Sequence, residues 1–402
     1  MIEKRIVNWK SRTVLFLISQ CVTLFGSTLV QMAIVWYVTL NTSSGVWVAV
    51  FSICSYLPQF LMSFIGGVWA DRYSRKRLII GADISIAAVT FIMMLAMPFI
   101  REEKFLLGGL LVMSIIRSVG AGIQTPAVNA VIPQLVPESQ LMRFNGINAT
   151  MQSLVQFAAP AAAGLLLSLS TLQSTLIIDI LTAVFGVGIL SCVLIPKQRS
   201  IEKSASVIKD MRMGIHFAFS DKLIRKLLIV YGLFTFLCVP AGFLAGLLVN
   251  RVYGNTYWYL TAVELIGFFG MIMGGLLMSL WRGFKSRINT LVFGLFIFGI
   301  MAVGMGLTKK FILYLILMAL YGVALTIVQT SITTLIQENV KSLMQGRIFG
   351  LMGSMYSGFI PIGMVIFGPM ADIIPLEWII VCSGVLVMMI AMILRFDHQL
   401  YK

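Results

Sequence analysis

The stretch GVWADRYSRKR, residues 67–77, is the part of this sequence that most directly decides the fold. Five charged residues fall between positions 71 and 77, and one long apolar run precedes the stretch while another follows it. Two apolar segments joined by a turn this short and this basic are typical of membrane-spanning helices that meet at a cytoplasmic hairpin. The stretch therefore predicts a membrane protein and places this turn on the inner side of the membrane.

Composition supports a chain that is solvated by lipid. The 402 residues are 59% hydrophobic and only 11% charged, with a mean hydropathy of +0.97. Soluble globular domains carry about 25% charged residues. The first apolar run, near residues 13–38, is too long for a secretory signal and lacks a small-residue cleavage site, so we interpret it as an uncleaved first span.

A helix needs roughly 20 mostly apolar residues to cross a bilayer, and the chain contains twelve such runs. They lie near residues 13–38, 46–69, 78–99, 105–128, 143–168, 173–194, 223–248, 257–281, 289–308, 311–334, 346–371 and 376–395. The pattern predicts an all-α membrane protein with twelve transmembrane helices.

The basic residues set the orientation. If the N-terminus is cytoplasmic, 24 of the 30 Lys and Arg residues fall on inner segments, five fall on outer segments, and Arg117 alone lies within a span. Cytoplasmic loops carry this excess of positive charge, so we expect both termini inside. The net charge of +15 then reflects topology, and no nucleic acid partner is expected.

The chain divides into two halves. Residues 195–222 form the longest hydrophilic stretch, and their apolar residues recur at helical spacing, which predicts a cytoplasmic amphipathic linker. The linker separates an N-terminal six-helix bundle, residues 1–194, from a C-terminal one, residues 223–402. Pro160 and Pro361 lie 201 residues apart, and Gly120 and Gly322 lie 202 apart, as expected for two pseudo-symmetric bundles.

The opening stretch also has the pattern G-x-x-x-D-R-x-x-R-K-R, which resembles the signature loop between helices 2 and 3 of the major facilitator superfamily of transporters. In that family the aspartate and the arginine form a charge cluster that holds the outward-facing state. The resemblance implies a gating role for Gly67, Asp71, Arg72, Arg75 and Lys76. We expect Gly67 to allow a close helix approach. The second-half counterpart, residues 275–285, carries Ser279 in place of the aspartate, and the alternative is that the charges only set topology.

Arg117 is the exceptional charge, because an arginine near the middle of a span is costly and usually faces a cavity or a partner. The surrounding sequence IIRSVGAG resembles the family's span-4 motif, which is implicated in proton transfer, although the usual glutamine is missing. A buried structural ion pair is the alternative. Three acids within spans could titrate. Glu264 and Asp179 are the candidate proton carriers, and Asp83, near the cytoplasmic end of its span, could instead pair with the basic turn. For these acids a hydrogen bond between helices is the alternative role.

Four further stretches resemble the bacterial macrolide efflux family. They are residues 31–39, 125–141, 193–197 and 346–354. The resemblance implies proton-driven export of hydrophobic drugs across the bacterial cell membrane. Gln20 and Gln31 in the first span are candidates for the substrate cavity.

Several activities find no support in the sequence. No nucleotide-binding P-loop and no protease or hydrolase motif occurs, the five cysteines are isolated, and only two histidines exist. We therefore expect no enzyme activity, no cofactor and no metal, and a monomer whose partners are protons, lipid and a small hydrophobic substrate. Export of a physiological solute such as a siderophore or a lysolipid is the nearest alternative, and an apolar cavity leaves no motif that names its ligand.

Overall fold

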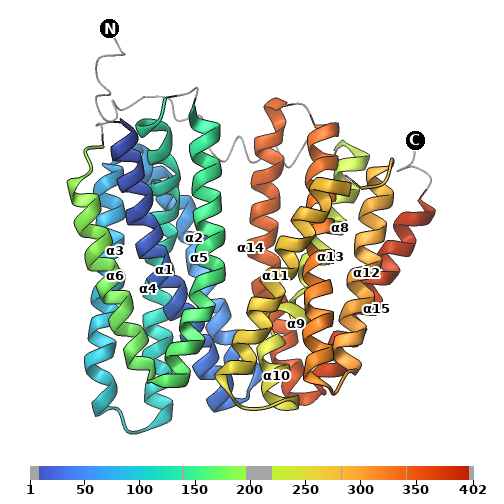
Figure 1. The fold of residues 1–402 in the computed structure, drawn as a ribbon, viewed down its shortest axis with the longest axis horizontal. Helices are drawn as coiled ribbons and strands as arrows, with labels where there is room; N and C mark the ends of the chain where they lie inside the picture. Colours follow the sequence, from blue (N-terminus) through green and yellow to red (C-terminus); the bar gives the residue numbers. More distant parts are fainter. Residues whose placement is uncertain (1–8, 138–139, 196–219, 282, 341, 398–402) are drawn as a thin grey trace. The chain divides into compact units, whose positions relative to one another are not determined.

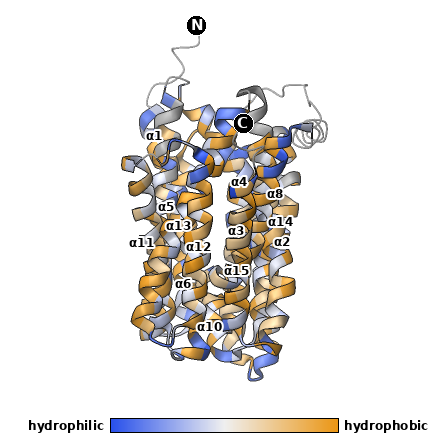
Figure 2. Ribbon diagram, turned by 90° about the vertical axis from the view of Figure 1, so that its right-hand side faces the viewer, coloured by the Kyte–Doolittle hydropathy of each residue, from blue (hydrophilic) through white to orange (hydrophobic). Residues whose placement is uncertain are grey.

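The computed structural model describes residues 9–137, 140–195, 220–281, 283–340 and 342–397, and every regular element in these ranges is helical. Helices suit this composition because lipid offers the backbone no hydrogen-bond partners, so each span must satisfy its own amide and carbonyl groups. Large apolar side chains such as Leu61, Phe91 and Ile393 remain exposed on the helix surfaces, as expected where lipid is the solvent. Figure 2 shows hydrophobic residues along the helices and hydrophilic residues gathered at their ends.

The chain forms two units. Unit 1 comprises residues 1–38 and 51–202, and unit 2 comprises residues 39–50 and 203–402. The first six long helices in chain order are α1 (Trp9–Thr42), α2 (Gly45–Arg72), α3 (Arg75–Ala96), α4 (Glu103–Leu135), α5 (Leu141–Leu169) and α6 (Leu172–Cys192), with the short η2 (Met97–Phe99) after α3. The remaining helices are α8 (Lys222–Leu237), α9 (Val239–Gly242), α10 (Ala245–Val252), α11 (Tyr257–Trp281), α12 (Arg287–Leu307), α13 (Phe311–Asn339), α14 (Ser342–Ile373) and α15 (Leu376–Phe396).

The prediction of twelve membrane spans is confirmed, because twelve segments of the described chain are long and apolar enough to cross a bilayer. Some helices extend beyond the predicted spans. Helix α4 continues to Leu135 and α13 continues to Asn339, several residues past the apolar runs that marked them. The amphipathic linker predicted for residues 195–222 lies almost wholly outside the described residues, so the linker and the domain limits around it stay predictions.

The seventh span differs from the continuous helix that its apolar run predicts. It is built from α8, α9 and α10, with breaks at Cys238 and around Phe243–Leu244. Pro240 lies just inside α9, where a proline that lacks an amide hydrogen is tolerated at the start of a helix. The break turns one long span into stacked short helices within unit 2.

In unit 1, helix α3 packs against both α4 and α6 (Figure 1). Near the turn between α2 and α3 an apolar core cluster joins these helices to α1, with buried members that include Phe16, Ile79, Ala127, Val131 and Leu190. Burial of apolar side chains inside each bundle leaves the polar groups described below enclosed between helices.

In unit 2, glycines bring helix pairs into close contact. A Cβ at Gly270 of α11 would lie 2.1 Å from the carbonyl oxygen of Ala319 in α13, and a Cβ at Gly299 of α12 would lie 2.6 Å from that of Gly384 in α15. Any larger side chain at these positions would push the backbones apart, so small residues set the packing of these helices.

Candidate functional site

A buried ion pair lies in the interior of unit 1. The guanidinium of Arg117 in α4 makes a salt bridge to the carboxylate of Asp179 in α6, with the second nitrogen, Nη2, 3.4 Å from Oδ1. Arg117 is 8% exposed and Asp179 is 2% exposed. Sequence reasoning selected both residues separately and did not predict that they bind each other.

Two further groups complete this site. The hydroxyl of Thr90 in α3 accepts a hydrogen bond of 2.6 Å from Arg117 Nη1. The same hydroxyl donates a hydrogen bond of 3.2 Å to Asp179 Oδ2. The backbone carbonyl of Ser27 in α1 lies 3.4 Å from Arg117 Nη2. Four helices thus converge on one ion pair, and α1 approaches closely because a Cβ at Gly26 would lie only 3.1 Å from Asp179 Oδ1.

The arrangement has a chemical consequence. Burial of a charged group away from water costs several kcal/mol. Two buried groups of opposite charge both stay ionised only when their mutual attraction and hydrogen bonds offset this cost. Protonation of Asp179 would remove one charge and leave Arg117 without its counter-ion. The pair is therefore suited to link a proton to a change in helix packing, and it is equally able to act as a structural ion pair.

A second polar layer of unit 1 contains Asp83. Its side chain is 4% exposed, and Oδ1 accepts a hydrogen bond of 2.7 Å from Nε2 of Gln124 in α4. Its other oxygen, Oδ2, has no hydrogen-bond partner among the described residues. The alternative that Asp83 pairs with the basic turn is wrong, because its partner is this neutral amide.

Two basic residues of the stretch 67–77, Arg75 and Lys76, bind backbone carbonyls. Arg75 donates to the carbonyls of Ala70 and Ala130 at 3.0 and 2.6 Å. Lys76 donates to those of Ser191 and Val193 at 2.7 and 2.8 Å. The last carbonyls of a helix lack intrahelical partners and carry partial negative charge. These side chains therefore tie the ends of α2, α4 and α6 together.

The other members of the predicted gating motif differ in what the structure describes. Arg72 is exposed at the end of α2, and the side chain of Asp71 lies outside the described part of the chain. The expectation that Gly67 allows a close approach is wrong, since a Cβ there would meet nothing within 4 Å. Its neighbour Gly66 has that role, because its Cβ would lie 2.6 Å from the carbonyl oxygen of Gly122 in α4.

Glu264 lies in unit 2 on α11. Its side chain is half-buried, and it makes no hydrogen bond or ion pair with the described residues. The hydroxyl of Tyr314 in α13 interacts with it electrostatically, and this hydroxyl is buried without a hydrogen-bond partner in the described structure. Among the described residues Glu264 thus has no counter-ion, unlike Asp179.

The structure adds a polar junction that sequence reasoning missed. Asp372, at the end of α14, accepts hydrogen bonds from the backbone amides of Gly45 and Val46 at 2.6 and 2.9 Å. It also makes a salt bridge of 2.6 Å to Arg251 of α10, which donates to the carbonyl of Ser43. The first backbone amides of a helix lack intrahelical acceptors, and that end of the helix carries partial positive charge. The carboxylate of Asp372 accepts from these amides and interacts favourably with this charge. The only signals in the sequence were a lone acid and a lone arginine at predicted outer ends of spans.

Residues 39–50 therefore belong by their contacts to unit 2, although the chain before and after them belongs to unit 1. Close packing supports the junction, since a Cβ at Gly45 would lie 2.2 Å from the carbonyl oxygen of Gly368. The backbone of Ser43 has a φ of 47°, a conformation uncommon for a residue with a side chain. The turn between α1 and α2 is thus held by α10 and α14.

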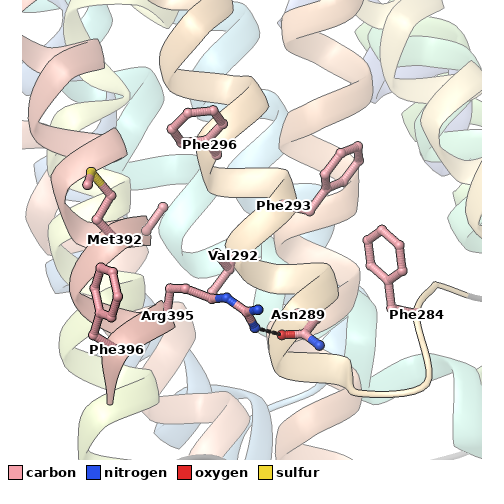
Figure 3. A pocket seen from close by; sticks show the side chains of 9 residues that line it. Phe284, Asn289, Val292, Phe293, Phe296, Met392, Arg395 and Phe396 are labelled. Carbon is pink, nitrogen blue, oxygen red and sulfur yellow. Dashed lines mark hydrogen bonds between the residues drawn. The ribbon is translucent and has the colours of Figure 1, made fainter. Parts of the chain in front are cut away.

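A groove of about 510 Å³ lies between α12 and α15 in unit 2 (Figure 3). Phenylalanines dominate its lining, and Arg395 donates a hydrogen bond of 2.9 Å to the side-chain oxygen of Asn289 at one end. None of the predicted site residues lines it. Gln20 is 8% exposed and Gln31 is half-buried, and their assignment to a substrate cavity stays a prediction. The described residues contain no cluster of His, Cys, Asp and Glu able to hold a metal ion.

Comparison with known proteins gives a consistent picture. The family model described as "Major Facilitator Superfamily" matches residues 16–364. Macrolide efflux protein A of Streptococcus pyogenes is 31% identical over 399 residues, which cover 98% of each chain. The staphyloferrin A transporter of Staphylococcus aureus (strain NCTC 8325 / PS 47) is 21% identical and covers 96% of each chain. The crystal structure of a bacterial homologue of the iron transporter ferroportin, in an inward-facing state, has a similar fold, with a TM-score of 0.72. The two sequences are 15% identical, and the match covers 96% of this chain and 99% of the other.

Proposed function

Because this chain belongs to the major facilitator superfamily, we propose that it is a secondary transporter that exports hydrophobic, macrolide-like drugs across the bacterial cytoplasmic membrane in exchange for protons. The observation that carries the substrate class is the 31% identity to Macrolide efflux protein A over almost the whole of both chains. The positive charges support an orientation with both termini in the cytoplasm.

Proton coupling is assigned to the buried charges. We assign proton exchange to two carboxylates: Asp179, which is held by Arg117, and Glu264, which has no counter-ion among the described residues. A carboxylate that loses its proton must be stabilised by a cation or by water. We assign the release of Asp179 from Arg117 to the step in which the proton binds, so that Arg117 controls the affinity of the site.

The ends of the helices are assigned to gating. Gly67, Asp71, Arg72, Arg75 and Lys76 lie at the turn that the charge pattern places in the cytoplasm, and we assign to them control of the cytoplasmic opening. Alternating access requires the contacts at this turn to break and re-form during the transport cycle.

A specific observation favours a second candidate substrate. The staphyloferrin A transporter covers 96% of this chain, and its name describes the transport of a siderophore. Export of a siderophore by the same machinery is therefore the alternative. Its 21% identity is lower than that of the macrolide efflux relatives, so we rank it second.

The test is accumulation of a labelled macrolide by cells that express the chain, with and without a protonophore. Proton-driven export predicts lower accumulation than in cells without the chain, and loss of this difference when the protonophore is added. Equal accumulation in both cell types, with the protein demonstrated in the membrane, would reject the macrolide and move the same assay to a labelled siderophore.

A further inference from the structure

The inference concerns Asp83, a buried acid to which the proposed mechanism gives no role. Only 4% of the residue is exposed. Its Oδ1 accepts one hydrogen bond, from the neutral side chain of Gln124, and its Oδ2 has no partner in the described part of the chain. Burial of a carboxylate that lacks a cation is so costly that such a group normally keeps its proton.

A second unpartnered group lies on α1. Nε2 of Gln20 is a buried donor that has no acceptor among the described residues. The hydroxyl of Ser19, its neighbour, donates a hydrogen bond of 2.8 Å to the carbonyl of Gly186 in α6, which fixes α1 beside α6 at this level. Gln20 therefore points an unused donor into the interior of unit 1.

The helices bring these groups to one level. Four buried apolar residues from α1, α3, α4 and α6 share one core cluster, namely Phe16, Ile79, Ala127 and Leu190. About one helical turn further into each span lie Gln20, Asp83, Gln124 and Gly186. The unpaired donor of Gln20 and the unpaired oxygen of Asp83 thus occur at the same level of the bundle. The apolar core cluster lies between this level and the turn that joins α2 to α3.

Charged groups on α3 and on the helices packed against it bind other partners, and Arg77 of α3 is exposed. On its own helix Arg75 and Lys76 bind backbone carbonyls near the turn. From the helices packed against α3, Arg117 of α4 and Asp179 of α6 bind each other. Seven residues separate Asp83 from Thr90 in this pair's layer, which is about 10 Å along the helix.

We propose that Asp83 is a proton-binding site, distinct from the Arg117–Asp179 pair, that holds a proton in this conformation. Gln124 donates a hydrogen bond to Oδ1 of Asp83. When the carboxyl is ionised, Nε2 of Gln20 donates a hydrogen bond to Oδ2. This inference rests on the proposed coupling of transport to protons. It gives unit 1 two carboxyl layers between which a proton can pass.

The transfer balances without any further reactant. The O–H bond breaks at the carboxyl of Asp179 and a water-mediated relay forms an O–H bond at the carboxylate of Asp83. Asp179 becomes ionised and pairs again with Arg117, as in this structure. Because Asp83 lies between that pair and the turn assigned to the cytoplasm, its site belongs to the release side of the path.

The experiment measures protonation directly in the purified full chain. Infrared difference spectra between acidic and alkaline buffers report the C=O stretch of protonated carboxyl groups. We expect Asp83→Asn to remove one component of this band, whereas Asp83→Glu and Gln124→Leu keep a titrating carboxyl. The matched control is Asp372→Asn, which changes an acid that is held by Arg251 and by backbone amides.

A band unchanged by Asp83→Asn, or one lost in Glu264→Gln instead, would overturn the proposal. If Asp83→Asn does not fold, the wild-type chain is grown with ¹³C-labelled aspartate and compared with Asp179→Asn grown in the same way, because the predicted band must move with the label and must persist in that variant. A band that stays in place belongs to a glutamate and contradicts the site. The spectra need no substrate, so they test Asp83 independently of transport. Transport that is insensitive to a protonophore would reject proton coupling, whereas the absence of the Asp83 band would reject the site.

Discussion

Replacement of Asp179 by asparagine tests the buried ion pair most sharply. The variant removes the negative charge and leaves the guanidinium of Arg117, 8% exposed, with neutral acceptors alone: the amide oxygen at position 179, the Thr90 hydroxyl and the Ser27 carbonyl. Breaking a buried pair by removing one partner costs about 3–5 kcal/mol. An ordinary hydrogen bond between membrane helices contributes only about 0.6 kcal/mol. The two roles of this contact are therefore separable by the size of the loss of stability.

The assay is thermal unfolding of the purified chain in detergent at one fixed scan rate, since unfolding of such proteins is commonly irreversible. Asp179→Asn and Arg117→Met should each lower the midpoint strongly, and the double variant Arg117→Met/Asp179→Leu should recover most of the loss because no unpaired charge remains. Glu102→Gln, in an exposed turn before α4, is the control. Single variants that behave like this control, or losses that simply add in the double variant, would refute the reasoning.

Three further predictions concern other parts of the chain. Gly66→Val should lower the unfolding midpoint because its Cβ would lie 2.6 Å from the Gly122 carbonyl oxygen, whereas Gly67→Val, with nothing within 4 Å, should leave the midpoint unchanged. Asp372→Ala should lower the midpoint in the same assay, because the start of α2 loses a cap that contributes about 1–2 kcal/mol, and Asp372→Asn should lower it less, because an amide oxygen still accepts from the backbone amides. Glu264→Gln should abolish proton-driven uptake in proteoliposomes while exchange of labelled for unlabelled substrate persists, and loss of both activities would contradict a role limited to coupling.

The number and the approximate places of the spans could be predicted because apolar length is a property of the local sequence. Their ends could not, since α4 and α13 continue as helices through polar residues beyond the apolar runs. A hydropathy window detects the bilayer and not the hydrogen bonds that extend a helix past it. The break in the seventh span at α9 could not be predicted from hydropathy either, because the side chains stay apolar through the break.

The candidate site was predictable only residue by residue. Arg117 and Asp179 stand out because charges within spans are rare, yet their pairing depends on how α4 and α6 pack. The glycines at 66 and 67 show the same limit, since a rotation of about 100° per residue along a helix decides which one faces α4. The contact of Asp372 with Gly45 joins residues 327 positions apart, and no local pattern reports such a contact.

The most direct test of the central claim is macrolide transport by the purified chain in proteoliposomes with an imposed pH gradient. Proton antiport predicts that a labelled macrolide accumulates inside vesicles whose interior is acidic, that accumulation stops without the gradient, and that a protonophore abolishes it. Accumulation that is equal with and without the gradient, or no movement of the macrolide by protein that folds and inserts, would contradict the account.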